Sequence, residues 1–142
     1  MRLRFLLVSL LVATACGKLT ELPTSPTDTG GGPPVDPSAT FTRVKTEVLP
    51  TCQAAGCHGA IAPQENLILA NDRAYAQIVN VTSTEVASLK RVAPGDATNS
   101  YLYRKITGVG ITGDRMPQGG PYLSDAQMAL VRDWIRRGAP ND

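Results

Sequence analysis

The sequence predicts a small all-α domain of three to four helices joined by long irregular loops. Apolar residues recur at helical spacing in four stretches, at about residues 40–49, 71–79, 100–106 and 124–138. Proline and glycine interrupt this pattern between the stretches, most densely at residues 108–121. Residues 80–93 mix β-branched side chains with a polar Thr-Ser-Thr cluster, so they are compatible with either a turn or extended chain.

Two of the expected helices lie in the first half of the domain. In the stretch 40–49, Phe41, Val44 and Val48 recur at helical spacing, and Pro50 ends the helix. The chain therefore passes directly from this helix into a stretch that contains two cysteines. The second helix, at about residues 71–79, begins at a capping asparagine and has three apolar residues on one side, Tyr75, Ile78 and Val79.

The other two helices follow a Pro-Gly-Asp turn and a glycine-rich loop. At residues 100–106 the apolar positions are Tyr101, Leu102 and Ile106, and either Asn99 or Asp96 is the expected cap. The last helix begins at Ser124, which forms a capping box with Gln127. It is amphipathic and should pack on the first helix through the apolar residues Met128, Val131, Trp134 and Ile135, before Gly138 and Pro140 end it.

The N-terminus is typical of an exported, lipid-anchored protein. Two arginines, a short apolar run and small residues fill positions 1–15, a run that is too short to span a bilayer. Cleavage before Cys16 would make this cysteine the first residue of the mature chain. The residues around it resemble the lipobox of bacterial lipoproteins. In that family the thiol of the first cysteine is acylated and anchors the chain to a membrane. An ordinary secreted protein with a spare Cys16 is the alternative. Both interpretations place the protein outside the cytoplasm. A lipid-anchored chain would face the periplasm, on either the inner or the outer membrane.

Residues 16–39 are predicted to be a tether, and residues 40–142 the folded domain. The tether is rich in Thr, Pro, Ser and Gly and cannot bury enough apolar surface to fold. Removal of residues 1–15 leaves basic residues equal in number to the 12 acidic ones, so nothing indicates binding to nucleic acid. Two groups of basic residues are interpreted mainly as solvated surface: Arg132, Arg136 and Arg137, and Lys90, Arg91, Arg104 and Lys105.

The most informative stretch contains Cys52, Cys57 and His58, which are two of the three cysteines and the only histidine. These residues could close a disulfide loop, hold a metal ion, or attach haem covalently. In haem attachment each thiol adds to a vinyl group, and the adjacent imidazole binds the iron. The usual attachment signature has two residues between the cysteines, whereas this chain has four.

Met116 is the second candidate ligand. It lies between glycines and before Pro117, so it is expected on a loop rather than on a packing face. Met128, by contrast, belongs to the apolar stripe of the last helix, where methionine is an ordinary gap filler. A flat apolar cofactor would bury the side chain of Met116, and the thioether sulfur of Met116 would bind the metal of that cofactor. His58 and Met116 are therefore the plausible axial pair, and such a pair suits an electron carrier.

Residues 41–142 resemble a small class I-like cytochrome c domain of exported bacterial proteins. The resemblance is carried by the cysteine and histidine motif and by five further motifs, Val92-Ala93-Pro94-Gly95-Asp96, Tyr101-Leu102, Arg115-Met116-Pro117, Gly119-Gly120-Pro121 and the ending Trp134-Ile135 with Gly138-Ala139-Pro140. It implies three to four helices around one covalent haem c. By this resemblance Cys52 and Cys57 carry the thioether bonds, His58 is the proximal ligand and Met116 the distal one.

The expected function is that of a lipid-anchored monohaem cytochrome that carries single electrons between redox proteins outside the cytoplasm. No carboxylate pair, activated serine or phosphate loop indicates a small-molecule substrate, so an electron-transfer protein is expected rather than an enzyme. Two alternatives stay open. One is a copper-binding lipoprotein that uses Cys52, Cys57, His58 and Met116, because soft ligands select copper. The other is a structural lipoprotein with a Cys52–Cys57 disulfide.

Overall fold

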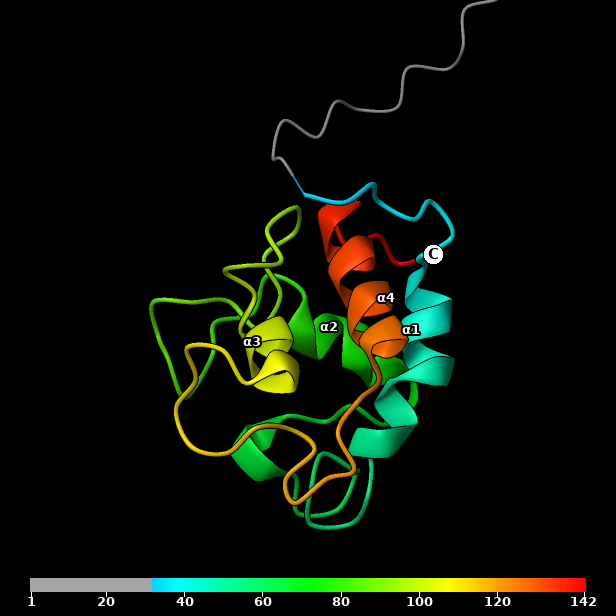
Figure 1. The fold of residues 1–142 in the computed structure, drawn as a ribbon. Coiled ribbons are helices and arrows are strands. Elements are labelled where there is room, and N and C mark those ends of the chain that lie inside the picture. The colour runs from blue at the N-terminus through cyan, green and yellow to red at the C-terminus, as the bar shows by residue number, and fades with distance from the viewer. Residues whose placement is uncertain (1–31) are drawn as a thin grey trace, which may run out of the picture. The chain divides into compact units, whose positions relative to one another are not determined.

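Four α-helices and three short 3-10 helices form the regular structure of residues 32–142, the part of the chain that the computed structural model describes (Figure 1). Within this part there is no sheet, only isolated β-bridges, so the described chain is all-α as predicted. The predicted signal segment 1–15, Cys16 and residues 17–31 of the predicted tether lie outside the described residues. No helix within residues 32–142 combines the length and apolar character needed to cross a membrane.

Helix α1 (Phe41–Glu47) begins at Thr40, whose hydroxyl accepts a hydrogen bond from the N–H of Arg43 at 3.2 Å. The sequence predicted that this helix would end at Pro50. The α-helix ends earlier, and a 3-10 helix, Leu49–Cys52, continues the chain. Proline is tolerated in the first turn of a helix, where its missing N–H has no partner to lose. The 3-10 turn therefore leads from α1 into the cysteine motif without a break.

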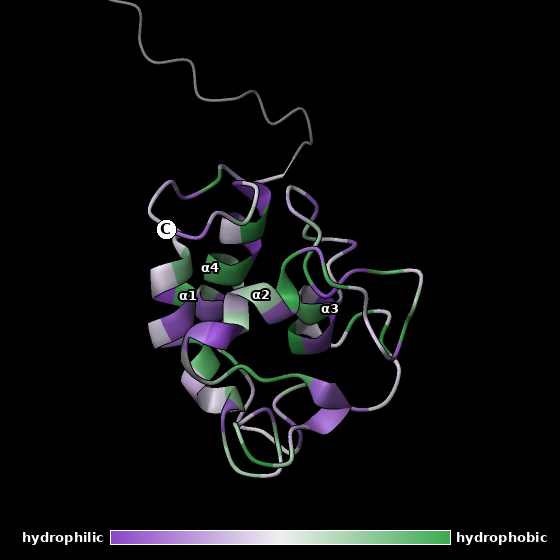
Figure 2. Ribbon diagram, turned by 180° about the vertical axis from the view of Figure 1, so that it is seen from behind, coloured by the Kyte–Doolittle hydropathy of each residue, from purple (hydrophilic) through white to green (hydrophobic). Residues whose placement is uncertain are grey.

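Helix α4 (Asp125–Arg136) confirms the predicted capping box between Ser124 and Gln127. Its apolar stripe packs against α1, as predicted, and the two helices lie side by side in Figure 1. The side chain of Gln127 also donates to the carbonyl of Glu47 at 2.8 Å, which fixes the end of α1 to the start of α4. In Figure 2 both helices carry apolar (green) and polar (purple) residues in turn, as expected for amphipathic helices.

The second and third predicted helices are also present. Helix α2 (Ala74–Ile78) follows a 3-10 turn, Asn71–Arg73, and α3 spans Tyr101–Thr107. The expected cap of α3 was wrong, because Ser100 occupies the N-cap position and makes no side-chain capping bond. Asp96 instead accepts from the N–H of Asn99 at 3.0 Å and stabilises the turn before the helix.

The aromatic part of the core lies between α1, α2 and α4. Phe41 of α1 contacts the rings of Tyr75 and Trp134, with centroid separations of 5.1 and 5.3 Å. The polar atoms of these two partners are satisfied near the C-terminus, because the Tyr75 hydroxyl donates to Ala139 O and the Trp134 indole N–H donates to Pro140 O. Burying aromatic rings with their polar ends bonded is a large stabilising contribution in so small a domain.

Residues 33–142 form one compact unit, which begins before the predicted boundary at residue 40. Ala39 is fully buried, and the N–H of Asp36 donates to the carboxylate of Asp133 on α4 at 3.3 Å. Arg136 donates to the carbonyl of Pro33 at 2.6 Å. These contacts attach residues 33–39 to α4 although their composition resembles that of the predicted tether.

Candidate haem-attachment site

The Cys52–His58 stretch folds back on itself as a closed loop. The N–H of His58 donates to the carbonyl of Cys52 at 3.0 Å, and the N–H of Cys57 donates to the carbonyl of Ala54 at 3.0 Å. Four residues between the cysteines are therefore accommodated by a turn, with the two ends of the motif held together. The two thiols and the imidazole, which the sequence predicted as one site, all belong to this single loop.

Both cysteines of the loop are free thiols. Cys57 is exposed, and Cys52 is half-buried against the core at the end of the 3-10 turn that follows α1. Burial raises the pKa of the Cys52 thiol; the Thr51 hydroxyl, which lies 3.5 Å from the sulfur, opposes this effect. The protonated thiol is thus the favoured form of Cys52 in the unmodified chain.

His58 is half-buried, and its ring is oriented by the backbone. Its Nδ1 lies 3.3 Å from the carbonyl of Leu67, and since a carbonyl only accepts, Nδ1 carries the proton of this hydrogen bond. Nε2 is then the nitrogen with the free lone pair, which is the usual arrangement of a histidine that binds a metal. The pKa of His58 is lowered, because burial outweighs the opposing effect of its hydrogen bonds to the backbone of Leu67 and Gln64; the charges of Arg91 and Lys105 lower it slightly further. The net effect favours the neutral ring, the form that ligates.

The segment that orients His58 is held from behind by Arg91. The guanidinium donates to the carbonyl of Glu65 at 2.9 Å and to that of Gln77, on α2, at 3.0 Å. Ala62, Glu65 and Asn66 have positive φ angles, which non-glycine residues adopt at a cost, so the segment needs external support. Arg91 supplies it and thereby fixes the loop that carries Leu67 to the helical core.

Met116 lies on the other long loop, which is docked on the end of α3. Its N–H donates to the carbonyl of Lys105 at 2.9 Å. The preceding residue, Arg115, donates through Nε to the carbonyl of Ile106 at 2.8 Å and stacks on the ring of Tyr122 at 4.3 Å. The side chain of Met116 is half-buried, as are those of its neighbours Arg115 and Pro117, whereas residues 112–114 and 118–119 are exposed.

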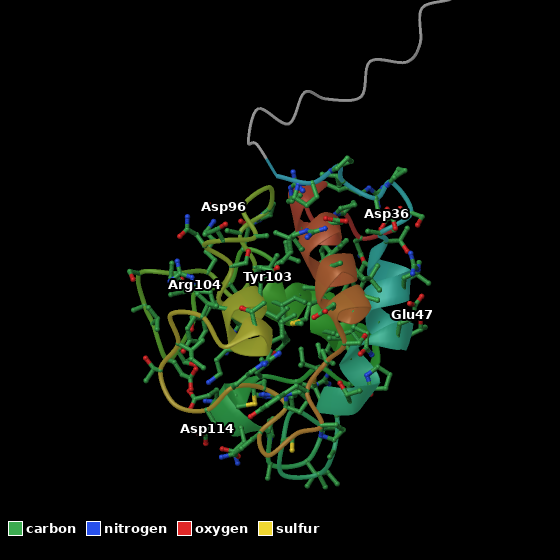
Figure 3. All side chains as sticks on the ribbon, viewed as in Figure 1. Asp36, Glu47, Asp96, Tyr103, Arg104 and Asp114 are labelled. Atoms are coloured by element: carbon green, nitrogen blue, oxygen red, sulfur yellow. The ribbon has the colours of Figure 1, made fainter. Side chains whose placement is uncertain are left out.

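These two loops lie at the same end of the domain, away from the C-terminus (Figure 1). Figure 3 places Asp114, on the Met116 loop, at this end, and Asp36 at the opposite end. Every residue from 107 to 122 is exposed or half-buried, and within 53–69 only Gly59 and Leu69 are buried. Long loops with so little buried surface of their own are commonly functional.

Lys105 contacts one of the two candidate ligands directly, because its carbonyl accepts from the N–H of Met116 at 2.9 Å. Within residues 32–142, no three His, Cys, Asp or Glu side chains come together as a group that could hold a metal ion. Cys52, Cys57 and His58 therefore share a loop without converging on one point.

The sequence analysis missed the residues that support these ligands. Arg91 and Lys105 were assigned to solvated surface, yet they are only 8% and 9% exposed. Their polar heads are bonded inside the protein, to backbone carbonyls and to Glu85, which offsets the cost of their burial. No local pattern marks them, because each partner lies on a separate segment. Of the supporting residues, only Arg115 could have been found from the sequence, because it lies beside Met116 in the Arg115-Met116-Pro117 motif.

Comparison with protein-family models, curated proteins and solved structures finds no match to this chain. Two thiols separated along a closed loop, a neutral imidazole presented through Nε2 and a thioether on a second loop are the residue types that attach and ligate the iron-containing ring of haem c.

Proposed function

We propose that this protein is a monohaem c-type cytochrome that carries single electrons. Cys52 and Cys57 hold the haem through thioether bonds, and His58 and Met116 are its axial ligands. The observation that carries the proposal is the closed Cys52–His58 loop, on which the imidazole is oriented through Nδ1 beside two free thiols. Bound haem would supply a one-electron iron couple, and His/Met ligation favours a comparatively high reduction potential.

The protein's own groups position the two axial ligands. Leu67 fixes the His58 ring, Arg91 supports the segment that contains Leu67, and α3 holds the Met116 loop. A single metal ion needs its ligands to converge, which Cys52, Cys57 and His58 do not. A ring with several separate points of attachment suits their spacing better than copper or zinc does.

Optical spectroscopy of the full chain tests the proposal, after expression with cytochrome c maturation machinery. The denatured, acid-acetone-extracted polypeptide should retain haem in a pyridine haemochrome assay. The weak methionine-to-iron absorption band should be present in the wild type and absent from Met116→Leu. Met128→Leu is the matched control, because Met128 is also half-buried but lies on α4; it should keep the band even though it removes the contact from Arg115 Nη2 to the Met128 sulfur at 3.5 Å. A colourless chain with a Cys52–Cys57 disulfide would make the proposal wrong.

The proposed cytochrome acts at a membrane, where lipid on Cys16 anchors it and residues 17–32 form a tether. Cys16→Ser should move the protein from the membrane fraction to the soluble fraction while its haem spectrum stays unchanged. A Cys16→Ser protein that remains with the membrane would contradict lipid anchoring, but it would leave the haem proposal standing. The redox partners are then proteins outside the cytoplasm that the domain reaches on its tether.

A further inference from the structure

Lys105 makes an unusual set of contacts for a lysine on a short helix. It is only 9% exposed, and its Nζ forms an ion pair with Glu85 Oε2 at 3.1 Å. The same Nζ donates to the carbonyl of Thr112 at 3.0 Å and lies 5.8 Å from the centre of the Tyr101 ring. Meanwhile the Lys105 carbonyl accepts from the N–H of Met116. One residue thus holds the Met116 loop at two points.

Apart from Lys105, the loop is fixed mainly by Arg115, which donates to the carbonyl of Ile106 and stacks on the ring of Tyr122. Gly108, Gly110 and Gly113 all have positive φ angles, and no residue from 107 to 122 is buried. Thr112 has a second anchor, since its N–H donates to the Tyr101 hydroxyl at 3.1 Å. The charged contact to Lys105 is the stronger kind of bond, because hydrogen bonds with an ionised partner are about twice as strong as neutral ones.

Glu85 is what allows the ammonium to stay in this position. An ammonium buried without an opposite charge is strongly disfavoured, whereas one paired with a carboxylate is tolerated. Glu85 belongs to the segment between α2 and α3, so the pair also joins that segment to the Met116 loop. Without the carboxylate, the ammonium of Lys105 is more stable when it turns out and is hydrated by water. The carbonyl of Thr112 then loses its hydrogen bond from Nζ.

We propose that the Glu85–Lys105 ion pair is a positioning device that keeps Met116 on the haem iron. This inference rests on the proposed function. Neither Glu85 nor Lys105 touches the iron. They act through the loop, by holding Thr112 while the Lys105 carbonyl holds Met116. A loosened loop lets the thioether leave the iron more often, and an added ligand can then take its place.

The test is imidazole binding to the ferric full-length holoprotein, because imidazole competes with Met116 for the iron. Glu85→Gln should bind imidazole about tenfold more tightly than the wild type, the factor expected for loss of one charge-assisted hydrogen bond. The methionine-to-iron band should weaken and the reduction potential should fall. Glu85→Asp, which keeps the charge, should recover part of each change. The matched control is Asp72→Asn, which breaks the exposed Lys45–Asp72 pair of 2.8 Å and should alter none of the three readouts.

The proposal is overturned if a folded Glu85→Gln holoprotein keeps the imidazole affinity, the methionine-to-iron band and the reduction potential of the wild type. If Glu85→Gln does not fold, the double variant Glu85→Gln/Lys105→Met is measured instead, because it leaves no unpaired buried charge. The double variant should show the same tighter imidazole binding, and wild-type binding would again overturn the proposal. A wild-type chain without covalent haem would refute the proposed function itself, which the haemochrome assay shows before any variant is made.

Discussion

Gly59 is the residue at which the cysteine loop has the least room. A Cβ atom built on it would lie 2.7 Å from the carbonyl oxygen of Gln53 and 3.2 Å from that of Ala54. Both obstacles are backbone atoms of the same closed loop, so they cannot move aside as a flexible side chain would. The close packing of the loop therefore requires glycine directly after His58.

Gly59→Ala should destabilise the protein by about 1–3 kcal/mol, the usual range for overpacking, and should lower the yield of covalent haem. Chemical denaturation and the haemochrome assay measure the two effects. Gly95→Ala is the control, because a Cβ there meets nothing within 4 Å and only the positive φ of +84° is strained. It should lower stability by about 1 kcal/mol and leave the haem yield unchanged. Equal haem yields for both variants would argue against a rigid attachment loop.

Asp142 connects the end of the chain to the start of α1. Its carboxylate accepts from the N–H of Phe41 at 2.9 Å and pairs with Arg137 at 3.1 Å, while its carbonyl accepts from the N–H of Thr42 at 2.9 Å. The first N–H groups of a helix have no partner within it, so these bonds act as a cap supplied from outside the helix. Figure 1 shows the C-terminus beside α1.

Asp142→Ala should therefore destabilise the protein by about 1 kcal/mol, as the loss of an N-cap does. Asp72→Ala serves as the comparison, because its carboxylate is 97% exposed and its solvent-screened ion pair with Lys45 should contribute almost nothing to stability. Urea denaturation of the two variants measures both values. Similar stabilities for the two variants would contradict a capping role for Asp142.

The turn before α3 should make stability depend on pH. Hydrogen bonds from the side chain and then the N–H of Asn99 hold the pKa of Asp96 below its ordinary value of 3.8. A carboxyl with a depressed pKa stabilises the fold fully above its ordinary pKa and loses that contribution as the pH falls through the lower, folded-state value. Asp96→Asn should thus melt at a lower temperature than the wild type at pH 7, and the difference should shrink below pH 3.8. A difference that persists unchanged in acid would contradict this assignment.

At the scale of secondary-structure elements, the local sequence predicted the helices well, because the contacts that determine a helix and its cap are local. The positions of all four helices followed from apolar spacing, and Ser124 and Gln127 confirmed the capping box. The continuation of the chain past Pro50 as a 3-10 turn was not visible, because a proline that ends one helix can begin another.

Only the reactive side chains of the candidate site could be predicted from the sequence. Cys52, Cys57, His58 and Met116 have distinctive chemistry, and their placement on two loops follows from the surrounding glycine and proline residues. The supports could not be found in this way. Arg91 contacts Glu65 and Gln77, and Lys105 contacts Glu85 and Thr112, so each depends on how separate segments meet in the fold.

Across the described domain, most of the apolar core lies apart from the two candidate loops, although Cys52 packs against it. Phe41, Tyr75 and Trp134 pack among α1, α2 and α4, whereas only Gly59 and Leu69 are buried within residues 53–69 and no residue is buried within 107–122. A segment with few buried contacts opens at low free energy, while a packed helix opens only when the domain unfolds. The stability of the helical core should therefore depend little on haem, whereas that of the two loops should depend on it strongly.

Amide hydrogen exchange on haem-free and haem-containing full-length protein tests this difference. In the haem-free chain, α1 and α4 should keep slowly exchanging amides, because their core does not involve the loops. The N–H groups of Cys57, His58 and Met116 should exchange fast, although each has a backbone acceptor. With haem attached, these three amides should slow by at least about tenfold, because the cofactor bonds to both loops and adds buried surface. Equal protection of the three amides with and without haem would mean that the loops are stable on their own, and it would remove the structural reason to expect a cofactor between them.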